Sequence, residues 1–192
     1  MSKITFELLQ DSNLEQCKML CDELMRFQQS KAVIHPEYFD TMSFETRMKP
    51  AYENAKYKHG VIVKDGDIPI GYTFATISTV TKETLDFWPA GMPETKDSTG
   101  FYPETLPVPQ KIGSINNIYL REDYKGQGLG GKLFDMSMQW IRGFSDVTLM
   151  FIYISNGNTQ AYDFYLRKGF KPSHDVFGGF IKAVYYDCNE RS

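Results

Sequence analysis

The sequence predicts an α/β fold in a single domain. Strand-like and helix-like segments alternate along the 192 residues, and no linker composition divides them. Residues 147–154 are almost all apolar, which is typical of a strand covered on both faces. A strand pattern over 112–120 runs through a glycine-rich turn into an amphipathic helix. We therefore expect one domain over 1–192.

The N-terminal part predicts a short strand over 4–9 followed by two helical stretches. Asn13 is a candidate N-cap for the first helix. A second stretch begins near Pro36, and Pro50 falls inside it, so we expect a break or kink there. The apolar face of the first helix consists of Leu14, Cys17, Leu20, Cys21, Leu24 and Phe27.

The middle of the chain predicts a hairpin and then a long connection. Residues 61–64 and 70–80 alternate like strands and flank Asp65-Gly66-Asp67, a strong turn signal. Residues 81–111 are rich in proline, glycine and aromatics and have no clear period, which is long for a loop in a compact domain. We interpret this segment as a lid or specificity loop; the alternative is an excursion that covers a sheet edge or a partner surface.

The last third predicts strand, helix, strand, helix and a closing strand region. The expected elements are a strand over 112–120, a helix over 127–142 with an apolar face, a strand over 147–154 and a helix over 158–168. Residues 177–187 supply one or two closing strands.

Composition excludes several classes of protein. The net charge of −3 and a pI of about 5.6 argue against a general affinity for nucleic acid. No apolar run approaches the ~18 residues of a spanning helix, and the N-terminus lacks an apolar signal region, so we expect no membrane partner and a cytoplasmic location. The three cysteines cannot all pair and are expected to be reduced thiols, with no metal site.

The glycine-rich turn favours a bound phosphate, because glycines at a strand-to-helix junction let backbone N–H groups approach an anion. Gly126 to Lys132 fits the triphosphate pattern GxxxxGK, but Leu133 follows where a magnesium-binding Ser or Thr is needed. A GxGxxG dinucleotide pattern through Gly126, Gly128 and Gly131 lacks the acidic residue at the end of the next strand. The third interpretation is a pyrophosphate loop for coenzyme A, which a motif further along the chain supports.

Two motifs in order carry a resemblance to a known family. The loop from Lys125 to Gly130 is similar to Q/R-x-x-G-x-G/A, with Lys in the first place. About thirty residues later comes N-x-x-A-x-x-x-Y-x-R-x-G-F, formed by Asn158, Ala161, Tyr165, Arg167, Gly169 and Phe170. Over 113–170 the chain resembles the GNAT superfamily of acyl-CoA-dependent N-acyltransferases. The resemblance implies a central mixed β-sheet with helices on both faces, and one N-acetyltransferase domain over 1–192 that carries the 81–111 insertion.

The resemblance also implies a site and an activity. The co-substrate would be acetyl-CoA, without a metal, and the reaction would be acetyl transfer to a primary amine by direct attack through a tetrahedral intermediate. Tyr165 would be the general acid that protonates the leaving thiolate. Backbone groups of the fourth strand would hold the pantetheine and polarise the thioester, and the loop would hold the pyrophosphate. The implied cofactor-binding residues are Ile118, Tyr119, Leu120, Lys125, Gly126, Gln127, Gly128, Leu129, Gly130, Lys132 and Asn158; helix capping alone also accounts for Asn158, and a solvated surface position for Lys132.

The general base and the acceptor stay open. Ser114 stands where many family members carry a Glu, and serine cannot deprotonate an ammonium ion at neutral pH. The options are water relayed by Asn116 or Asn117, a carboxylate from Glu83, Asp86 or Glu104, or an acceptor that is already neutral. The alternative function is a non-catalytic acyl-CoA sensor of the same fold. The acceptor is a small-molecule amine or a peptide amine, an acidic pocket of Asp86, Glu94, Asp97 and Glu104 would suit a cationic one, and the protein is a monomer or a homodimer.

Overall fold

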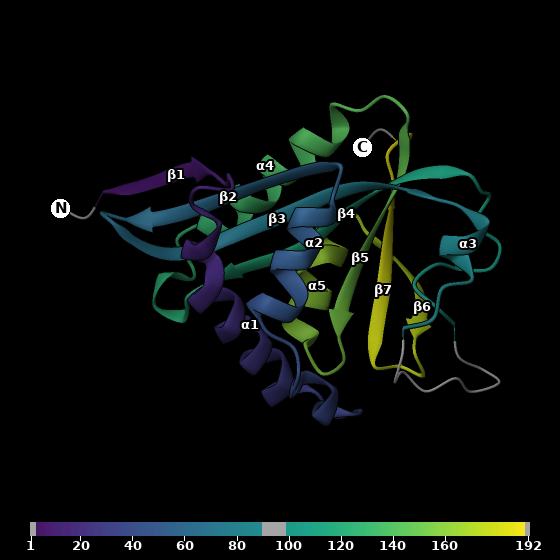
Figure 1. The fold of residues 1–192 in the computed structure, drawn as a ribbon, viewed down its shortest axis with the longest axis horizontal. Helices are drawn as coiled ribbons and strands as arrows, with labels where there is room; N and C mark the ends of the chain where they lie inside the picture. The colour runs from purple at the N-terminus through teal and green to yellow at the C-terminus, as the bar shows by residue number, and fades with distance from the viewer. Residues whose placement is uncertain (1–2, 90–98, 191–192) are drawn as a thin grey trace.

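A single mixed sheet forms the centre of the computed structural model, which describes residues 3–89 and 99–190 (Figure 1). Within these residues the strand order is β1-β2-β3-β4-β5-β7-β6. The β4–β5 pair is parallel and all the other pairs are antiparallel. The strands are β1 (Ile4–Leu8), β2 (Tyr57–Asp65), β3 (Ile68–Val80), β4 (Gln110–Leu120), β5 (Val147–Ser155), β6 (Lys171–Val176) and β7 (Ile181–Asp187).

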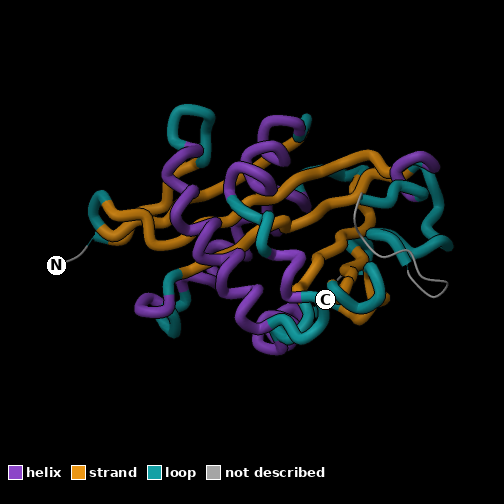
Figure 2. The backbone as a smooth tube through the Cα atoms, turned by 60° about the horizontal axis from the view of Figure 1, so that its bottom comes forward, coloured by secondary structure: helices purple, strands orange, loops and turns teal. Residues whose placement is uncertain are grey.

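Helices cover both faces of this sheet, as the sequence predicts (Figures 1 and 2). On β2, Ile62 packs with residues of α1, whereas its neighbours Val61 and Val63 pack with Leu133 of α4. Successive strand residues point to opposite faces, so α1 and α4 lie on opposite sides. The α-helices are α1 (Lys18–Lys31), α2 (Lys49–Asn54), α3 (Lys82–Leu85), α4 (Leu129–Arg142) and α5 (Thr159–Arg167). None of the helices described is long and apolar enough to cross a membrane.

The apolar run of β5 is explained by burial on both faces. Met150, Ile152 and Ile154 join the core cluster under α4 and α5, while Phe151 and Tyr153 face the opposite side. Because both faces are covered, an alternating polar pattern is absent, and the prediction of a doubly covered strand is confirmed.

Asn13 occupies the N-cap position of the 3₁₀ turn that leads into the first helix, but its side chain makes no capping hydrogen bond. Its Oδ1 accepts a hydrogen bond from the N–H of Gln10 (2.7 Å), and its Nδ2 donates to the carbonyl of Leu8 (3.0 Å). The side chain therefore stabilises the turn after β1, an alternative that Asn offers the backbone in competition with capping. The chain enters α1 through a 3₁₀ turn, η1 (Leu14–Cys17), without a side-chain cap.

The second helical stretch is divided, but not by Pro50. A 3₁₀ turn, η2 (Pro36–Phe39), is separate from a continuous pair formed by a π-helix, η3 (Phe44–Met48), and α2. Pro50 lies in the first turn of α2, directly after the π-helix. The helical stretch continues through Pro50, so the predicted break is wrong, and a kink there stays a prediction.

Strand β6 was not predicted, and the 81–111 segment is partly ordered. Residues Lys171–Val176 are mostly polar and form an edge strand beside β7, so they lack the apolar alternation that marks other strands. The described part of the insertion contains α3. A short 3₁₀ turn, η4 (Glu122–Tyr124), comes later and follows β4. Aromatic contacts of Trp88 and Phe101 with Phe177 fasten the insertion to the sheet. Residues 90–98 lie outside the described residues, and a lid role stays a prediction.

One buried asparagine joins the end of α1 to the ends of β5 and β7. The Oδ1 of Asn156 accepts from the N–H groups of Val33 (2.6 Å) and Ile34 (2.7 Å). Its Nδ2 donates to the carbonyls of Ile34 and Phe180, both at 2.9 Å. Next to it, Gly157 has φ +78°, and a Cβ there would lie 1.9 Å from the carbonyl oxygen of Lys31. Two segments 120 residues apart are thus held in direct backbone contact.

We expect Asn156→Ala to destabilise the protein by about 3 kcal/mol, because it leaves buried backbone donors and acceptors without partners. The exposed Asn54→Ala is the matched control, with an expected change within about 0.5 kcal/mol. Urea unfolding of both variants measures the two values. Equal stability of the two variants would contradict this account of the asparagine.

Candidate active site

The site begins where β4 and β5 separate. The two strands pair only from Lys111 to Ser114, whereas β4 stays paired with β3 up to Leu120. The hydroxyl of Ser114 donates to the carbonyl of Phe151 (2.9 Å) at the last paired position, and Asn116 is the extra residue of a β-bulge against β3. A bulge increases local twist, so the edge of β4 beyond Ser114 turns away from β5 and has no strand beside it.

A cavity of about 370 Å³ lies along this free edge. We call it the glycine-loop cavity. Its walls come from the end of β4, the loop that precedes α4, one face of α5 and two residues of α1. Its lining residues are Leu24, Phe27, Ile118, Tyr119, Leu120, Lys125, Gly126, Gly128, Gly130, Gly131, Asn158, Gln160, Ala161, Phe164, Tyr165 and Arg167.

The loop presents a row of unused backbone donors to this cavity. None of the N–H groups of residues 126–131 donates to another described group. Gly126 and Gly128 have φ values of +76° and +78°, which glycine adopts without strain, and Gly128 is the N-cap of α4. A Cβ at Gly126, Gly128 or Gly130 would meet no atom within 4 Å, so a ligand can approach this backbone closely. Free N–H groups at a helix N-terminus form an anion site, and a pyrophosphate fits it.

Most of the predicted cofactor residues line this cavity, and three do not. Leu129 packs in the core cluster between β2, β3 and α4. The ammonium of Lys132 lies 4.0 Å from the ring centroid of Phe6, and Gln127 is exposed beside the loop. The side chain of Lys132 is therefore directed at an aromatic face, and its predicted phosphate contact stays a prediction.

Two cations flank the glycine loop. Lys125 pairs with Glu122 and lies 5.3 Å from the ring centroid of Phe27. Arg167, at the end of α5, is exposed and lines the cavity without an ion pair among the described residues. The sequence motif contains Arg167, but sequence reasoning gave it no role. Positive charge near free N–H groups adds to the attraction for a phosphate.

Tyr165 lies at the inner wall of the cavity. The residue is only 4% exposed and packs against Phe134, Phe164 and Phe170. Its hydroxyl makes no hydrogen bond with the described residues, although the ring lines the cavity. Burial raises the pKa of Tyr165 above its ordinary value, since the ionised phenol would lose its hydration. The hydroxyl is thus protonated and free to donate.

Asn158 caps α5. Its side-chain oxygen accepts a hydrogen bond from the N–H of Ala161 (3.2 Å), which satisfies one of the free donors of the first turn. The residue also lines the glycine-loop cavity, so its Nδ2 is available to a ligand. The capping role is present in the structure, and the predicted pantetheine contact stays a prediction.

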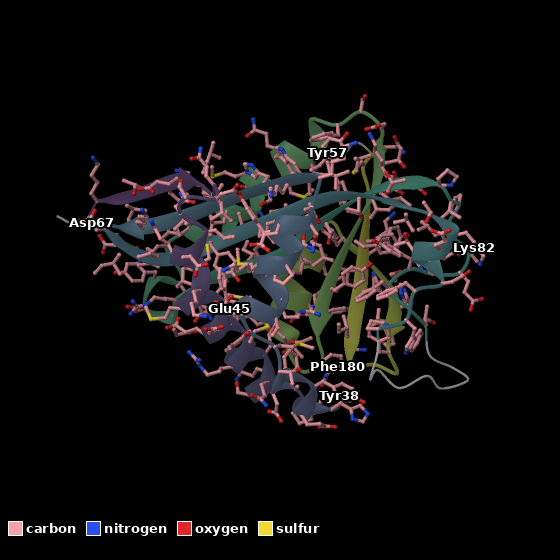
Figure 3. All side chains as sticks on the ribbon, viewed as in Figure 1. Tyr38, Glu45, Tyr57, Asp67, Lys82 and Phe180 are labelled. Atoms are coloured by element: carbon pink, nitrogen blue, oxygen red, sulfur yellow. The ribbon has the colours of Figure 1, made fainter. Side chains whose placement is uncertain are left out.

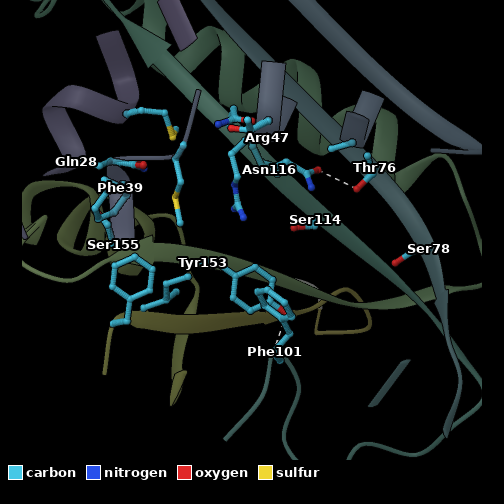
Figure 4. A pocket seen from close by; sticks show the side chains of 18 of the residues that line it. Gln28, Phe39, Arg47, Thr76, Ser78, Phe101, Ser114, Asn116, Tyr153 and Ser155 are labelled. Carbon is cyan, nitrogen blue, oxygen red and sulfur yellow. Dashed lines mark hydrogen bonds between the residues drawn. The ribbon is translucent and has the colours of Figure 1, made fainter. Parts of the chain in front are cut away.

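A second cavity, of about 400 Å³, is lined by the preceding residues of β4. Figure 4 shows this cavity from close by. We call it the Arg47 cavity. Ser114 to Asn117 line it, and the next three residues of β4 line the glycine-loop cavity, so consecutive positions on one strand serve both. Arg47 of η3 points into it (Figure 4). Its other walls include Gln28, Phe39, Met42, Thr76, Ser78, Phe101, Tyr102, Tyr153, Ser155 and Phe180.

No carboxylate lines the Arg47 cavity among the described residues. Glu83 and Glu104 are exposed outside it, and Asp86 pairs with Lys82. The hypothesised acidic pocket also includes Glu94 and Asp97, which lie outside the described residues. Asn116 and Asn117 do line the cavity, and Asn116 accepts a hydrogen bond from Thr76 (2.8 Å). The residues around the site contain no group of three His, Cys, Asp or Glu side chains that could hold a metal, in the described parts of the chain.

Sequence reasoning missed Arg47 and several residues of α5. Arg47 belongs to a segment whose sequence signal was only its apolar spacing, and nothing local predicts that it faces β4. The missed residues of the glycine-loop cavity are Leu24, Gly131, Gln160, Ala161, Phe164 and Arg167. For those on α5 the available signal was helical periodicity: residues at the spacing of Ala161 and Tyr165 share one face.

Comparisons with known proteins agree with this geometry. The structure is similar to PaiA N-acetyltransferase from Thermoplasma acidophilum in complex with coenzyme A, with a TM-score of 0.63, 13% identity, and coverage of 96% of this chain and 99% of that one. Smu.2055 from Streptococcus mutans is similar with a TM-score of 0.61 and 18% identity, and the match covers 96% of this chain and 99% of that one. Naa50 from Arabidopsis thaliana in complex with a bisubstrate analogue is similar with a TM-score of 0.59 and 13% identity, and the match covers 96% of this chain and 98% of that one. At such identities these similarities establish the fold.

The family follows from the sequence profile rather than from these structures. No curated protein matches the sequence. The profile of the acetyltransferase (GNAT) family, however, matches residues 19–170, which include both cavities' β4 residues, the glycine loop and α5. Its fold is the mixed sheet with helices on both faces described above. The chain therefore belongs to the acetyltransferase (GNAT) family, and it is an N-acetyltransferase that uses acetyl-CoA.

Proposed function

We propose that acetyl-CoA binds in the glycine-loop cavity and that the acetyl group passes to a primary amine held in the Arg47 cavity. The observation that carries this proposal is the continuity of β4, whose residues 114–117 line one cavity and 118–120 the other. The donor's pyrophosphate would accept from the free N–H groups of residues 126–131. Its pantetheine would lie along the unpaired edge of β4, as an added strand would.

The reaction proceeds by direct attack of the amine nitrogen on the thioester carbonyl carbon. A C–N bond forms, the carbonyl oxygen becomes an oxyanion, and a backbone N–H from Ile118, Tyr119 or Leu120 stabilises it. Collapse breaks the C–S bond, and Tyr165 donates its phenolic proton to the departing thiolate. The proton that the amine nitrogen loses passes to water, and Tyr165 regains a proton from solvent.

The amine must be neutral before it attacks, and the cavity itself favours that form. No carboxylate among the described lining residues stabilises an ammonium, and the charge of Arg47 disfavours a second cation nearby. Asn116 and Asn117 are positioned to hold a water that carries the released proton away. Ser114 has a different role, since its hydroxyl is engaged with the carbonyl of Phe151. The base is therefore water, and the acceptor's own pKa governs the rate.

Gly128→Glu should abolish acetyl-CoA binding, weakening it on the order of 100-fold or more, because the carboxylate would face the pyrophosphate. The matched control is Gly66→Glu in the β2–β3 turn, where φ is +60° and a Cβ also meets nothing within 4 Å. Both substitutions carry the same backbone cost, but Gly66 is outside the cavity. Isothermal calorimetry should find wild-type affinity in the control, and equal loss in both variants would refute the loop assignment.

Tyr165→Phe should lower kcat by about 100-fold while acetyl-CoA binding stays within about twofold, since only the proton donor is lost. Tyr162→Phe on the same helix is the control, because Tyr162 does not line the glycine-loop cavity. Thiol release with an amine acceptor measures kcat. An unchanged kcat in Tyr165→Phe would remove this residue from the mechanism.

The rate should follow the pH titration of the acceptor. Below the amine's pKa the neutral form grows tenfold per pH unit, so kcat/KM should rise about tenfold per unit and then level off. Burial raises the pKa of Tyr165, and its protonated form is the active one, so no alkaline decline is expected up to about pH 10. An acceptor with a lower amine pKa should move the rising limb down by the same amount. If the rise of kcat/KM with pH does not shift with the acceptor's pKa, the base is a group of the protein instead.

A further inference from the structure

Arg47 is a cation without a partner in the acceptor-side cavity. The structure gives its guanidinium no ion pair and no hydrogen bond within the described residues. The acidic neighbour on the same helical turn, Glu45, is already engaged by Lys18 (2.9 Å) and Lys49 (3.6 Å) on the outer surface. Arg47 instead extends from η3 toward β4 and Tyr153 (Figure 4).

No anion among the described residues offsets the charge of Arg47. The residue is exposed to solvent, and the neighbouring protein lowers the pKa of its guanidinium by desolvation. An arginine stays protonated all the same, so the described lining carries one fixed positive charge. A guanidinium without an anion beside it is available to a ligand, and a carboxylate would form charge-assisted hydrogen bonds with it.

The rest of the lining is neutral in the described part of the chain. Its polar groups are hydroxyls and amides, among them Gln28, Thr76 and Ser78. Its apolar walls include aromatic and methionine side chains, among them Phe39 and Phe180. A polyamine or another polycation would therefore meet a like charge and no counter-charge from the described residues. The cavity fits a ligand that supplies one negative charge and an apolar group.

We propose that the acceptor is an amine that also carries a carboxylate, that is, a free amino acid with an apolar or aromatic side chain. Arg47 binds the carboxylate through its planar fork, and the α-amine faces the β4 residues Ser114 to Asn117 where the thioester is presented. The apolar side chain packs against the aromatic walls. This inference rests on the proposed acetyl transfer and names its substrate class.

Charge distinguishes a free amino acid from two other classes of acceptor, a phosphate ester and a peptide N-terminus. A phosphate ester carries between one and two negative charges at neutral pH, more than one guanidinium matches. A peptide N-terminus offers an amide carbonyl where the free amino acid has its carboxylate, so it leaves Arg47 unpaired. Arginine binds a carboxylate in a bidentate way, which lysine cannot reproduce.

The test compares acceptors with and without a carboxylate beside the amine. With acetyl-CoA and wild-type protein, thiol release is measured for phenylalanine, phenylalanine amide, phenethylamine, phosphoethanolamine and a peptide with N-terminal phenylalanine. The proposal expects kcat/KM for phenylalanine to exceed the other four by about 10- to 100-fold, each compared at the pH where its amine is equally neutral. Equal or faster turnover of any of the other four would overturn it.

Variants at position 47 assign the preference to Arg47. Arg47→Met should lose about 10- to 100-fold more in kcat/KM for phenylalanine than it loses for phenethylamine, and Arg47→Lys should fall between Met and wild type. Arg26→Met is the matched control, since Arg26 is exposed on α1 and does not line the cavity. A parallel loss for both acceptors, or the same loss in Arg26→Met, would overturn the proposal.

A binding measurement separates this inference from the proposed function. The product analogue N-acetylphenylalanine and its amide are titrated by calorimetry into protein saturated with coenzyme A. Tighter binding of the acid, lost in Arg47→Met but not in Arg26→Met, supports the carboxylate site even when no amine is acetylated. Turnover of amines without any preference for the acid supports acetyl transfer and refutes the carboxylate site. Coenzyme A binding that is unchanged in all variants shows that they are folded.

Discussion

The separation of β4 from β5 is the constraint on which the rest of the site depends. The strands pair up to Ser114, whose hydroxyl takes the carbonyl of Phe151, and the bulge at Asn116 then turns β4 away. A strand edge with unpaired backbone groups is normally a liability, and here it faces two cavities. Both cavities share this one strand. In the proposed function, a thioester held on one side of it is presented to an amine on the other, so the gap in the sheet would set the geometry of acyl transfer.

The two cavities obtain their positive potential from different groups. The glycine loop attracts negative charge with backbone N–H groups at a helix N-terminus, and these groups need no side-chain charge of their own. The Arg47 cavity carries one guanidinium and, in its described lining, no acid. A cationic lining of this kind would favour the neutral form of a bound amine, and that form is the nucleophile. The proposed transfer therefore does not require a carboxylate in the described lining.

Packing keeps the walls of both cavities in place. The end of α1 is fixed to the ends of β5 and β7 by the four side-chain hydrogen bonds of Asn156, and Gly157 permits the close approach. Since α1 contributes to both cavities, its position relative to β4 affects the shape of both. The aromatic contacts of Trp88 and Phe101 hold the described part of the long insertion against the same end of the sheet. Residues of this insertion form part of the wall of the Arg47 cavity.

The sequence by itself determined the strand-loop-helix junction, the buried strand β5, the hairpin and the motif on α5, because each depends on local backbone preference or on residue periodicity. The glycines at 126 and 128 required positive φ, and their spacing indicated the anion site before any contact was known. Tertiary structure alone decided the rest. It placed Arg47 opposite β4, turned Lys132 toward Phe6 and made a polar segment into strand β6. These outcomes depend on which segments distant in the sequence come into contact, and no local sequence pattern predicts such contacts.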